Sequence, residues 1–201
     1  MNRQHQIILR GDPRYPARLR QRLGADAPPE LTALGNLELL SNPVTALFCS
    51  ARCPGSVILS AYDQAAQWRD AGRCVISGFH SPVEKECLRI LLRGSQPIII
   101  CPARGLPKCI PPERQMPLAE GRLLILSFFP NTVTHITADL AASRNEFVAA
   151  LAEEVHIVHA TPGGNLENLA SSLMAGLMPP SPTTGAGRCN RLRPRTKDKK
   201  E

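Results

Sequence analysis

Short apolar runs alternate with longer helical stretches along most of this chain, and this alternation restricts the possible folds more than any other feature. The five runs are four to six residues long and contain no Asp, Glu, Lys or Arg: 44–49, 74–77, 97–101, 123–128 and 155–159. Runs of this kind are typical of strands buried on both faces of a parallel sheet. Their alternation with helices predicts an α/β fold with a doubly wound, mainly parallel sheet and helices on both faces.

Two of the expected helices are marked by their spacing and by their ends. The apolar residues of segment 56–71 recur at three- and four-residue intervals, and Gly72 follows as a terminator: Val57, Ala61, Ala65 and Trp68. Ser81-Pro82 is a typical helix start, because serine caps free N–H groups and proline fits the first helical position. We predict helices over 56–71 and 82–93, and two more over 138–153 and 166–177.

The length of 201 residues suits one domain with small attachments. We predict a lead-in over 1–43 that packs on the core, a core over 44–177, and a disordered basic tail over 178–201. Residues 188–201 hold seven of the basic residues and two of the acidic ones, so the rest of the chain carries only +2 of the net charge of +7. The overall charge therefore says little about the folded site.

No feature of the sequence is typical of a membrane or secreted protein. No apolar run approaches the roughly 18 residues of a membrane span, and the first residues lack the apolar stretch of a signal peptide. We expect a cytoplasmic protein with no membrane partner. The seven cysteines form no Cys-x-x-Cys pair, which favours buried reduced thiols. A zinc site of Cys49, Cys53 and Cys101 is the alternative, but our prediction is no metal and no cofactor.

Small residues and single arginines follow the predicted strands. The carboxyl ends of parallel strands share one edge of a sheet, so these residues are expected to meet there: Ser50, Arg52, Ser77, Gly78, Arg104, Gly163 and Gly164. Backbone N–H groups and helix N-termini attract anions, and arginine binds a phosphate with two parallel hydrogen bonds. We predict a two-loop phosphate site, with two helix N-termini converging on one anion. Arg144 joins it if its helix points inward, and a plain structural turn is the alternative.

The chain resembles the Rossmann-like core of the DNA-processing protein A family (DprA/Smf) from about residue 14 to 170. Ser50-Ala51-Arg52 is similar to the family's Gly-Ser-Arg turn, and Ser77-Gly78-Phe79 to the start of its Ser-Gly-x-Ala-x-Gly-Ile-Asp motif. Further matches follow in the same order, with Tyr15-Pro16 and Pro28-Pro29 before these motifs, and Val83-Glu84, Arg104-Gly105-Leu106 and Ser143-Arg144-Asn145-Glu146 after them. The ordered series is more specific than any single motif.

The resemblance implies a non-enzymatic DNA recombination mediator that binds single-stranded DNA through its phosphates. By the same resemblance the RecA recombinase is a partner and a homodimer is expected. Arg52, Ser77, Gly78 and Arg144 would form the phosphate-contacting group, and these would support it: Ser50, Arg104, Asn145, Gly163 and Gly164. Glu146 stands where the family's Arg-Asn-Arg motif has a second arginine, which predicts weaker binding than in other members.

A small nucleotide is the alternative ligand. The segment 162–167, Pro-Gly-Gly-Asn-Leu-Glu, resembles the first half of the Pro-Gly-Gly-x-Gly-Thr-x-x-Glu motif of LOG-type nucleoside-monophosphate phosphoribohydrolases. The Gly-Thr pair is missing, and Glu167 falls two positions before the motif's catalytic glutamate. A nucleotide-binding sensor without chemistry lies between the two functions.

Overall fold

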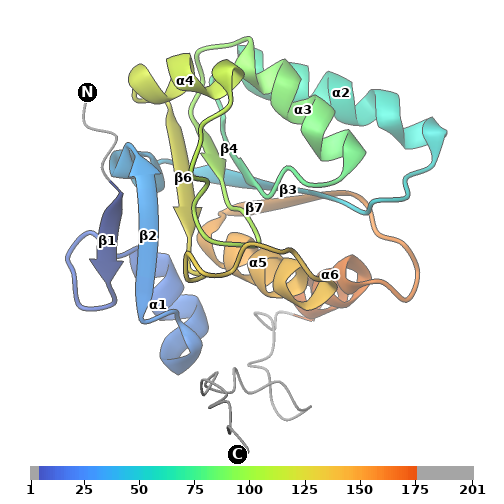
Figure 1. Ribbon diagram of the computed structural model, residues 1–201. Helices are drawn as coiled ribbons and strands as arrows, with labels where there is room; N and C mark the ends of the chain where they lie inside the picture. The colour runs from blue at the N-terminus through green and yellow to red at the C-terminus, as the bar shows by residue number, and fades with distance from the viewer. Residues whose placement is uncertain (1–4, 176–201) are drawn as a thin grey trace, which may run out of the picture.

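A computed structural model describes residues 5–175 of the protein (Figure 1). In this part of the chain, seven strands and six helices follow one another, with two short 3-10 helices, Gly24–Asp26 and Leu37–Ser41, beside the second strand. The strands are β1 (Gln6–Leu9), β2 (Glu30–Gly35), β3 (Val44–Cys49), β4 (Cys74–Ser77), β5 (Ile98–Ile100), β6 (Leu123–Ser127) and β7 (Glu154–His159). The helices are α1 (Ala17–Leu23), α2 (Gly55–Asp70), α3 (Pro82–Leu92), α4 (Pro112–Ala119), α5 (Ala138–Leu151) and α6 (Asn165–Met174).

All seven strands form one sheet in the order β1-β2-β6-β5-β4-β3-β7. The five strands from β3 to β7 are parallel to one another, whereas β2 pairs antiparallel with β6 and β1 antiparallel with β2. The five apolar runs of the sequence are these five parallel strands. The predicted α/β class with a doubly wound, mainly parallel sheet is confirmed.

Helices cover both faces of the sheet (Figure 1). On one face α2, α3 and α4 enclose a core that contains Leu47, Val75 and Ile125, and Trp68 of α2 is part of this core. On the other face α1, α5 and α6 enclose a second core around Phe48 and Phe147. Both faces of β3, β4, β5 and β6 are therefore buried, which explains why these strands are apolar throughout.

The lead-in contributes two strands of the sheet. Tyr15 is only 1% exposed, and its hydroxyl donates a hydrogen bond to the carbonyl of Pro28 at 2.8 Å. Arg22 of α1 donates to the carbonyl of Ala149 at the end of α5, at 3.1 Å. The Tyr15 bond holds the lead-in together, and the Arg22 contact and the pairing of β2 with β6 join residues 6–35 to the core, although the sequence indicated only that they pack against it. The predicted tail, 178–201, lies outside the described residues.

Two strands and two helices were missed by the sequence analysis: β1, β2, α1 and α4. In β1 only Ile8 is buried, while Ile7 and Leu9 are each 57% exposed, so the run does not have the pattern of a core strand. Helix α4 has Pro117 in its interior, where proline is unfavourable, and this proline is buried. Within residues 5–175, no helix is both long enough and apolar enough to span a membrane.

Candidate functional site

The loops that leave β3 and β7 lie side by side at the carboxyl edge of the sheet (Figure 1). Strand β3 lies between β4 and β7, and the chain leaves β3 for α2 on one face but leaves β7 for α6 on the other. The N–H of Thr161 donates to Ser50 Oγ at 3.0 Å, and Thr161 Oγ1 donates to the carbonyl of Arg52 at 3.3 Å. Crevices of this kind, where neighbouring loops diverge, are where open α/β sheets bind ligands.

The turn between β3 and α2, residues 50–54, is open to solvent, and we call it the open turn. Arg52 is exposed, and its carbonyl, not its guanidinium, makes the hydrogen bond to Thr161. Within residues 5–175 the guanidinium has no hydrogen-bond or ion-pair partner. Helix α2 begins after Pro54 without a side-chain cap, and Gly55 and Ser56 at its start are exposed. A free arginine and an uncapped helix N-terminus together attract anions.

The turn between β4 and α3, residues 77–81, is closed, and we call it the closed turn. Ser77 is fully buried, and its hydroxyl accepts a hydrogen bond from the N–H of Phe79 at 3.1 Å. Ser81 and Glu84 form a capping box at the start of α3. The expected convergence of two helix N-termini on one anion is therefore wrong for α3, because the N–H groups of His80 and Ser81 before the helix bind the Glu84 carboxylate and the Glu84 N–H donates to Ser81 Oγ.

Glu84 is the functional residue that the sequence analysis undervalued. Its carboxylate is 4% exposed and accepts hydrogen bonds from the N–H groups of Cys49 at 2.9 Å, His80 at 2.7 Å and Ser81 at 3.1 Å. The Ser-x-x-Glu spacing of a capping box marks this residue in the sequence. The bond to Cys49, which ties α3 to the end of β3, has no such signal because it joins residues 35 positions apart.

Arg144 points inward from α5, but it is buried beneath the turns instead of facing solvent. It is 5% exposed, and its guanidinium donates to the carbonyl of Cys101 at 3.1 Å and to Asn145 Oδ1 at 2.8 Å. The guanidinium lies directly against Gly78, where an added β carbon would be 1.0 Å from Arg144 Nη1. Burial lowers the pKa of Arg144, and the nearby charge of Glu84 acts in the opposite direction.

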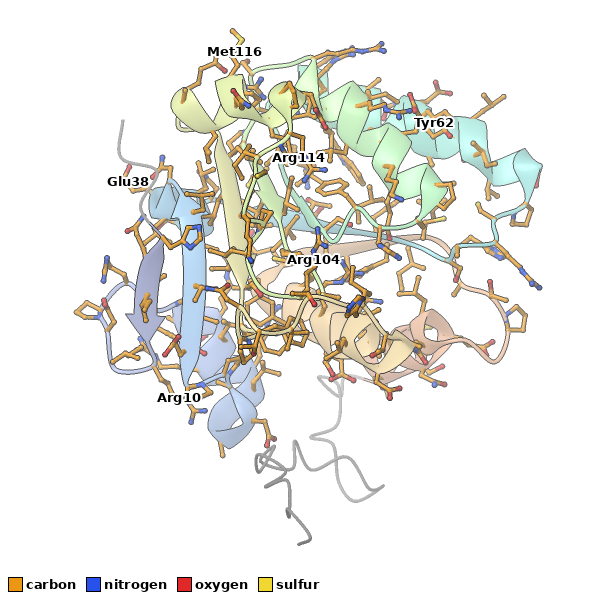
Figure 2. All side chains as sticks on the ribbon, viewed as in Figure 1. Arg10, Glu38, Tyr62, Arg104, Arg114 and Met116 are labelled. Carbon is orange, nitrogen blue, oxygen red and sulfur yellow. The ribbon has the colours of Figure 1, made fainter. Side chains whose placement is uncertain are left out.

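Arg104 is exposed on the loop between β5 and α4, which crosses in front of α5 (Figure 2). Its carbonyl accepts a hydrogen bond from Ser127 Oγ at 2.7 Å, so the loop is fixed to the end of β6. Arg114 of α4 lies on the same side of the molecule (Figure 2), and its pKa is lowered by burial and, to a smaller extent, by the charge of Arg104. Arg104 is therefore a second exposed cation at this edge, whereas Arg114 is half-buried.

The glycine turn before α6 is hydrogen-bonded to the carboxylate of Glu167. The N–H of Gly163, which has a φ of 72°, donates to Glu167 Oε2 at 2.6 Å, and the N–H of Gly164 donates to the carbonyl of Thr161 at 3.0 Å. Glu167 thereby ties the first turn of α6 to Gly163, the residue before the N-cap Gly164. Glu146, the departure from the family motif, is half-buried, and burial raises its pKa.

The cysteines give no support to the zinc alternative. Burial raises the pKa of Cys49, Cys74, Cys87 and Cys101 to about 12 each, as expected for thiols in an apolar core. Among the residues that the structure describes, no group of three or more His, Cys, Asp or Glu side chains is placed to hold a metal ion.

An open, mainly parallel sheet with helices on both faces defines an α/β domain of the Rossmann-like class. The sequence model of DNA recombination-mediator protein A matches residues 6–175. The chain belongs to this family, which confirms the resemblance to DNA-processing protein A.

Two solved structures share the fold. DNA processing protein A (DprA) from Streptococcus pneumoniae is 21% identical with a TM-score of 0.70, and the match covers 87% of this chain and 61% of that one. The protein from Helicobacter pylori, described for its unique single-stranded DNA binding mode, is 20% identical with a TM-score of 0.65, covering 86% of this chain and 76% of that one. This chain thus spans about three fifths of the S. pneumoniae protein. No curated protein sequence matches it.

Proposed function

We propose that this protein binds single-stranded DNA through the phosphates, at the carboxyl edge of the sheet, and that it catalyses no reaction there. Membership of the recombination-mediator family supports this function, as does the single-stranded DNA binding described for the similarly folded H. pylori protein. One observation carries the assignment to this edge. The guanidinium of Arg52 is exposed beside the uncapped start of α2, with no partner within residues 5–175.

The proposed contacts differ in strength along the edge. Arg52 is the primary phosphate contact, because an exposed and unpaired guanidinium loses little on binding and forms charge-assisted hydrogen bonds. Arg104 is a second contact across the strand ends. Ser50, Gly163 and Gly164 lie on the two loops that are hydrogen-bonded beside Arg52, and their contact with phosphate remains a prediction. Ser77, Gly78, Arg144 and Asn145 remain predicted members of the site, although their burial favours a supporting position.

The ligand class follows from which groups are exposed. Cations and backbone donors read phosphates but no base edges, so binding should tolerate any sequence and depend strongly on salt. RecA contact, a homodimer and a cytoplasmic location are further predictions that come with the family.

Titration of labelled oligo-dT at several salt concentrations tests the proposal. The full chain is used with the seven basic residues of 188–200 changed to glutamine, so that only the folded domain supplies cations. We expect binding at low salt, and Arg52→Ala should flatten the slope of log K against log salt by about 0.7, the value for one phosphate contact to a single strand.

Arg93→Ala is the matched control, because Arg93 is also exposed but caps the other end of α3, at the opposite edge of the strands. This variant should bind as the parent does. Absence of binding by the parent, or equal loss in Arg52→Ala and Arg93→Ala, would contradict the proposed site.

The phosphoribohydrolase alternative makes a separate prediction. Glu167, in the first turn of α6, accepts the Gly163 N–H, and this contact supports a structural role for its carboxylate. Release of free base from nucleoside monophosphates by the purified protein, and its loss in Glu167→Gln, would instead identify an enzyme.

A further inference from the structure

The two most buried charges near the proposed site are of opposite sign and come from opposite faces of the sheet. Glu84 belongs to α3, which packs with α2, and Arg144 belongs to α5, which packs with α1 and α6. Both point toward the ends of β3, β4 and β5. Charges this deeply buried are costly unless their hydrogen bonds are satisfied, so their position calls for a physical reason.

Glu84 binds backbone donors of two different loops. Its Oε1 accepts the N–H of Cys49 at the end of β3, and its Oε2 accepts the N–H groups of His80 and Ser81 in the closed turn. One carboxylate thus joins the base of the open turn to the start of α3. Three charge-assisted hydrogen bonds hold this arrangement, which fixes where the chain leaves β3 toward Arg52.

Arg144 holds the next loop along the edge. Its Nη1 donates to the carbonyl of Cys101, the residue from which the chain leaves β5 toward Arg104. Gly78 leaves the space that the guanidinium fills, since any side chain there would overlap it. Arg144 therefore connects α5 to the loop after β5 by passing directly beneath the closed turn.

The two charges act on each other without touching. Glu84 and Arg144 form no direct ion pair, but the negative charge of Glu84 favours the charged form of Arg144 and offsets part of its burial cost. Loss of either residue leaves the other charge buried without its counterpart, which is the costly arrangement. Glu84 and Arg144 are thus buried at the same turn, where Glu84 accepts the His80 and Ser81 N–H groups and Arg144 lies against Gly78.

We infer that Glu84 and Arg144 are positioning residues of the single-stranded DNA site, which hold the loops that carry Arg52 and Arg104 at the edge without contacting phosphate themselves. This inference rests on the proposed function. It also changes the role that the family resemblance implied for Arg144, from a direct phosphate contact to a support beneath the contacts.

A double-variant cycle separates support from contact. The same tail-neutralised full chain is titrated with oligo-dT as the parent, Arg104→Ala, Arg144→Ala and both together, because Arg144 holds the loop that carries Arg104. We expect Arg144→Ala to weaken binding by about tenfold, as lost supporting contacts do. In the Arg104→Ala background it should add little further loss and no further change in salt slope.

A further fall of about 0.7 in the slope of the double variant would overturn the inference, because it would mean that Arg144 neutralises a phosphate of its own. Unchanged binding by Arg144→Ala alone would overturn it as well. If Arg144→Ala does not fold, as judged by circular dichroism, Arg144→Lys carries the same cycle, because it keeps the charge but loses the guanidinium geometry.

Hydrogen exchange tests the positioning without any ligand. Arg144→Ala should speed amide exchange in the loop 101–108, and Glu84→Gln should speed it at 49–54 and 77–81, whereas Arg52→Ala should leave these loops as they are. Unchanged exchange in the first two variants would refute positioning even if DNA binds. Faster exchange in a protein that binds no oligo-dT would instead reject the proposed function alone.

Discussion

The open turn and the closed turn have similar sequences and opposite structures. Each follows a buried parallel strand, contains small residues and precedes a helix on the same face of the sheet. In the open turn Arg52 points to solvent and α2 has no side-chain cap. In the closed turn Ser77 is buried, α3 is capped by Glu84, and Arg144 fills the space beside Gly78.

The difference arises from side chains that come from elsewhere in the chain. The Glu84 side chain reaches back from the first turn of α3 to the amides that precede the helix, and Arg144 comes from α5 on the other face. The backbone N–H groups of His80 and Ser81 in the closed turn are already bonded to Glu84. Of the two turns, the open turn is therefore the one that presents an exposed donor side chain, Arg52. A repeated local pattern therefore produces one turn that is open to solvent and one that is largely buried.

The largest effect on stability is expected from adding a methyl group at Gly78 in the closed turn. Gly55, which follows the open turn at the start of α2, is the comparison. Gly78→Ala should lower the free energy of unfolding by about 2–3 kcal/mol, since the new β carbon overlaps the Arg144 guanidinium and forces the buried charge to move. Gly55→Ala, at the start of α2, has nothing within 4 Å of the new carbon. It should leave stability unchanged or raise it by up to ~1 kcal/mol. Urea denaturation measures both, and equal effects would remove the distinction between the turns.

Neutralising the buried carboxylate should have the next largest effect. Glu84→Gln should cost about 1–3 kcal/mol of unfolding free energy, because an amide oxygen accepts more weakly and the NH2 group then faces backbone donors. Glu86→Gln is the control on the same helix, where Glu86 pairs at 2.7 Å with an Arg89 that is 71% exposed. That change should stay within ~0.5 kcal/mol. A Glu84→Gln protein as stable as the control would show that the closed turn does not depend on this carboxylate.

A smaller effect with a defined pH dependence is expected at Glu146. Burial raises the pKa of this carboxyl above its unfolded value of 4.5, so the folded protein binds the proton more tightly than the unfolded chain. Its contribution to stability is therefore present below pH 4.5 and is lost as pH rises through the folded pKa. Glu146→Gln should stabilise the protein by about 0.5 kcal/mol at pH 7 and by less at pH 4. A gain that is larger at pH 4 would contradict this sign.

The smallest effect is expected in thiol reactivity, which reports how tightly the edge is closed. Burial raises the pKa of Cys101 to about 12, and Cys109 farther along the same loop is exposed. Iodoacetamide at pH 8 should label Cys109 quickly and Cys101 only slowly, because a buried and protonated thiol is a poor nucleophile. Arg144→Ala should raise the rate at Cys101. Mass spectrometry of the digested protein measures both rates, and equal labelling of the two cysteines in the parent would mean that this side of the edge is open.

Much of the fold follows from local sequence patterns. The five core strands, the helix starts at residues near 55 and 82, and the parallel arrangement of the sheet were all predicted, because each depends on burial and capping within a few residues. The strands β1 and β2 were missed because their partners are distant: Ile7 lies beside Thr32, and Thr32 beside Ser127. No local sequence pattern indicates which distant strand an edge strand pairs with.

The candidate site was likewise predictable only in part. The sequence alone predicted that Arg52, Arg104 and the glycine turn lie at one edge of the sheet, since the loops that follow parallel strands all open there. Only the tertiary structure decided which of them face solvent. The burial of Arg144 and the anchoring of Cys49 by Glu84 depend on contacts across 43 and 35 positions of the chain. They exist because packing brings two helices from opposite faces onto the same strand ends.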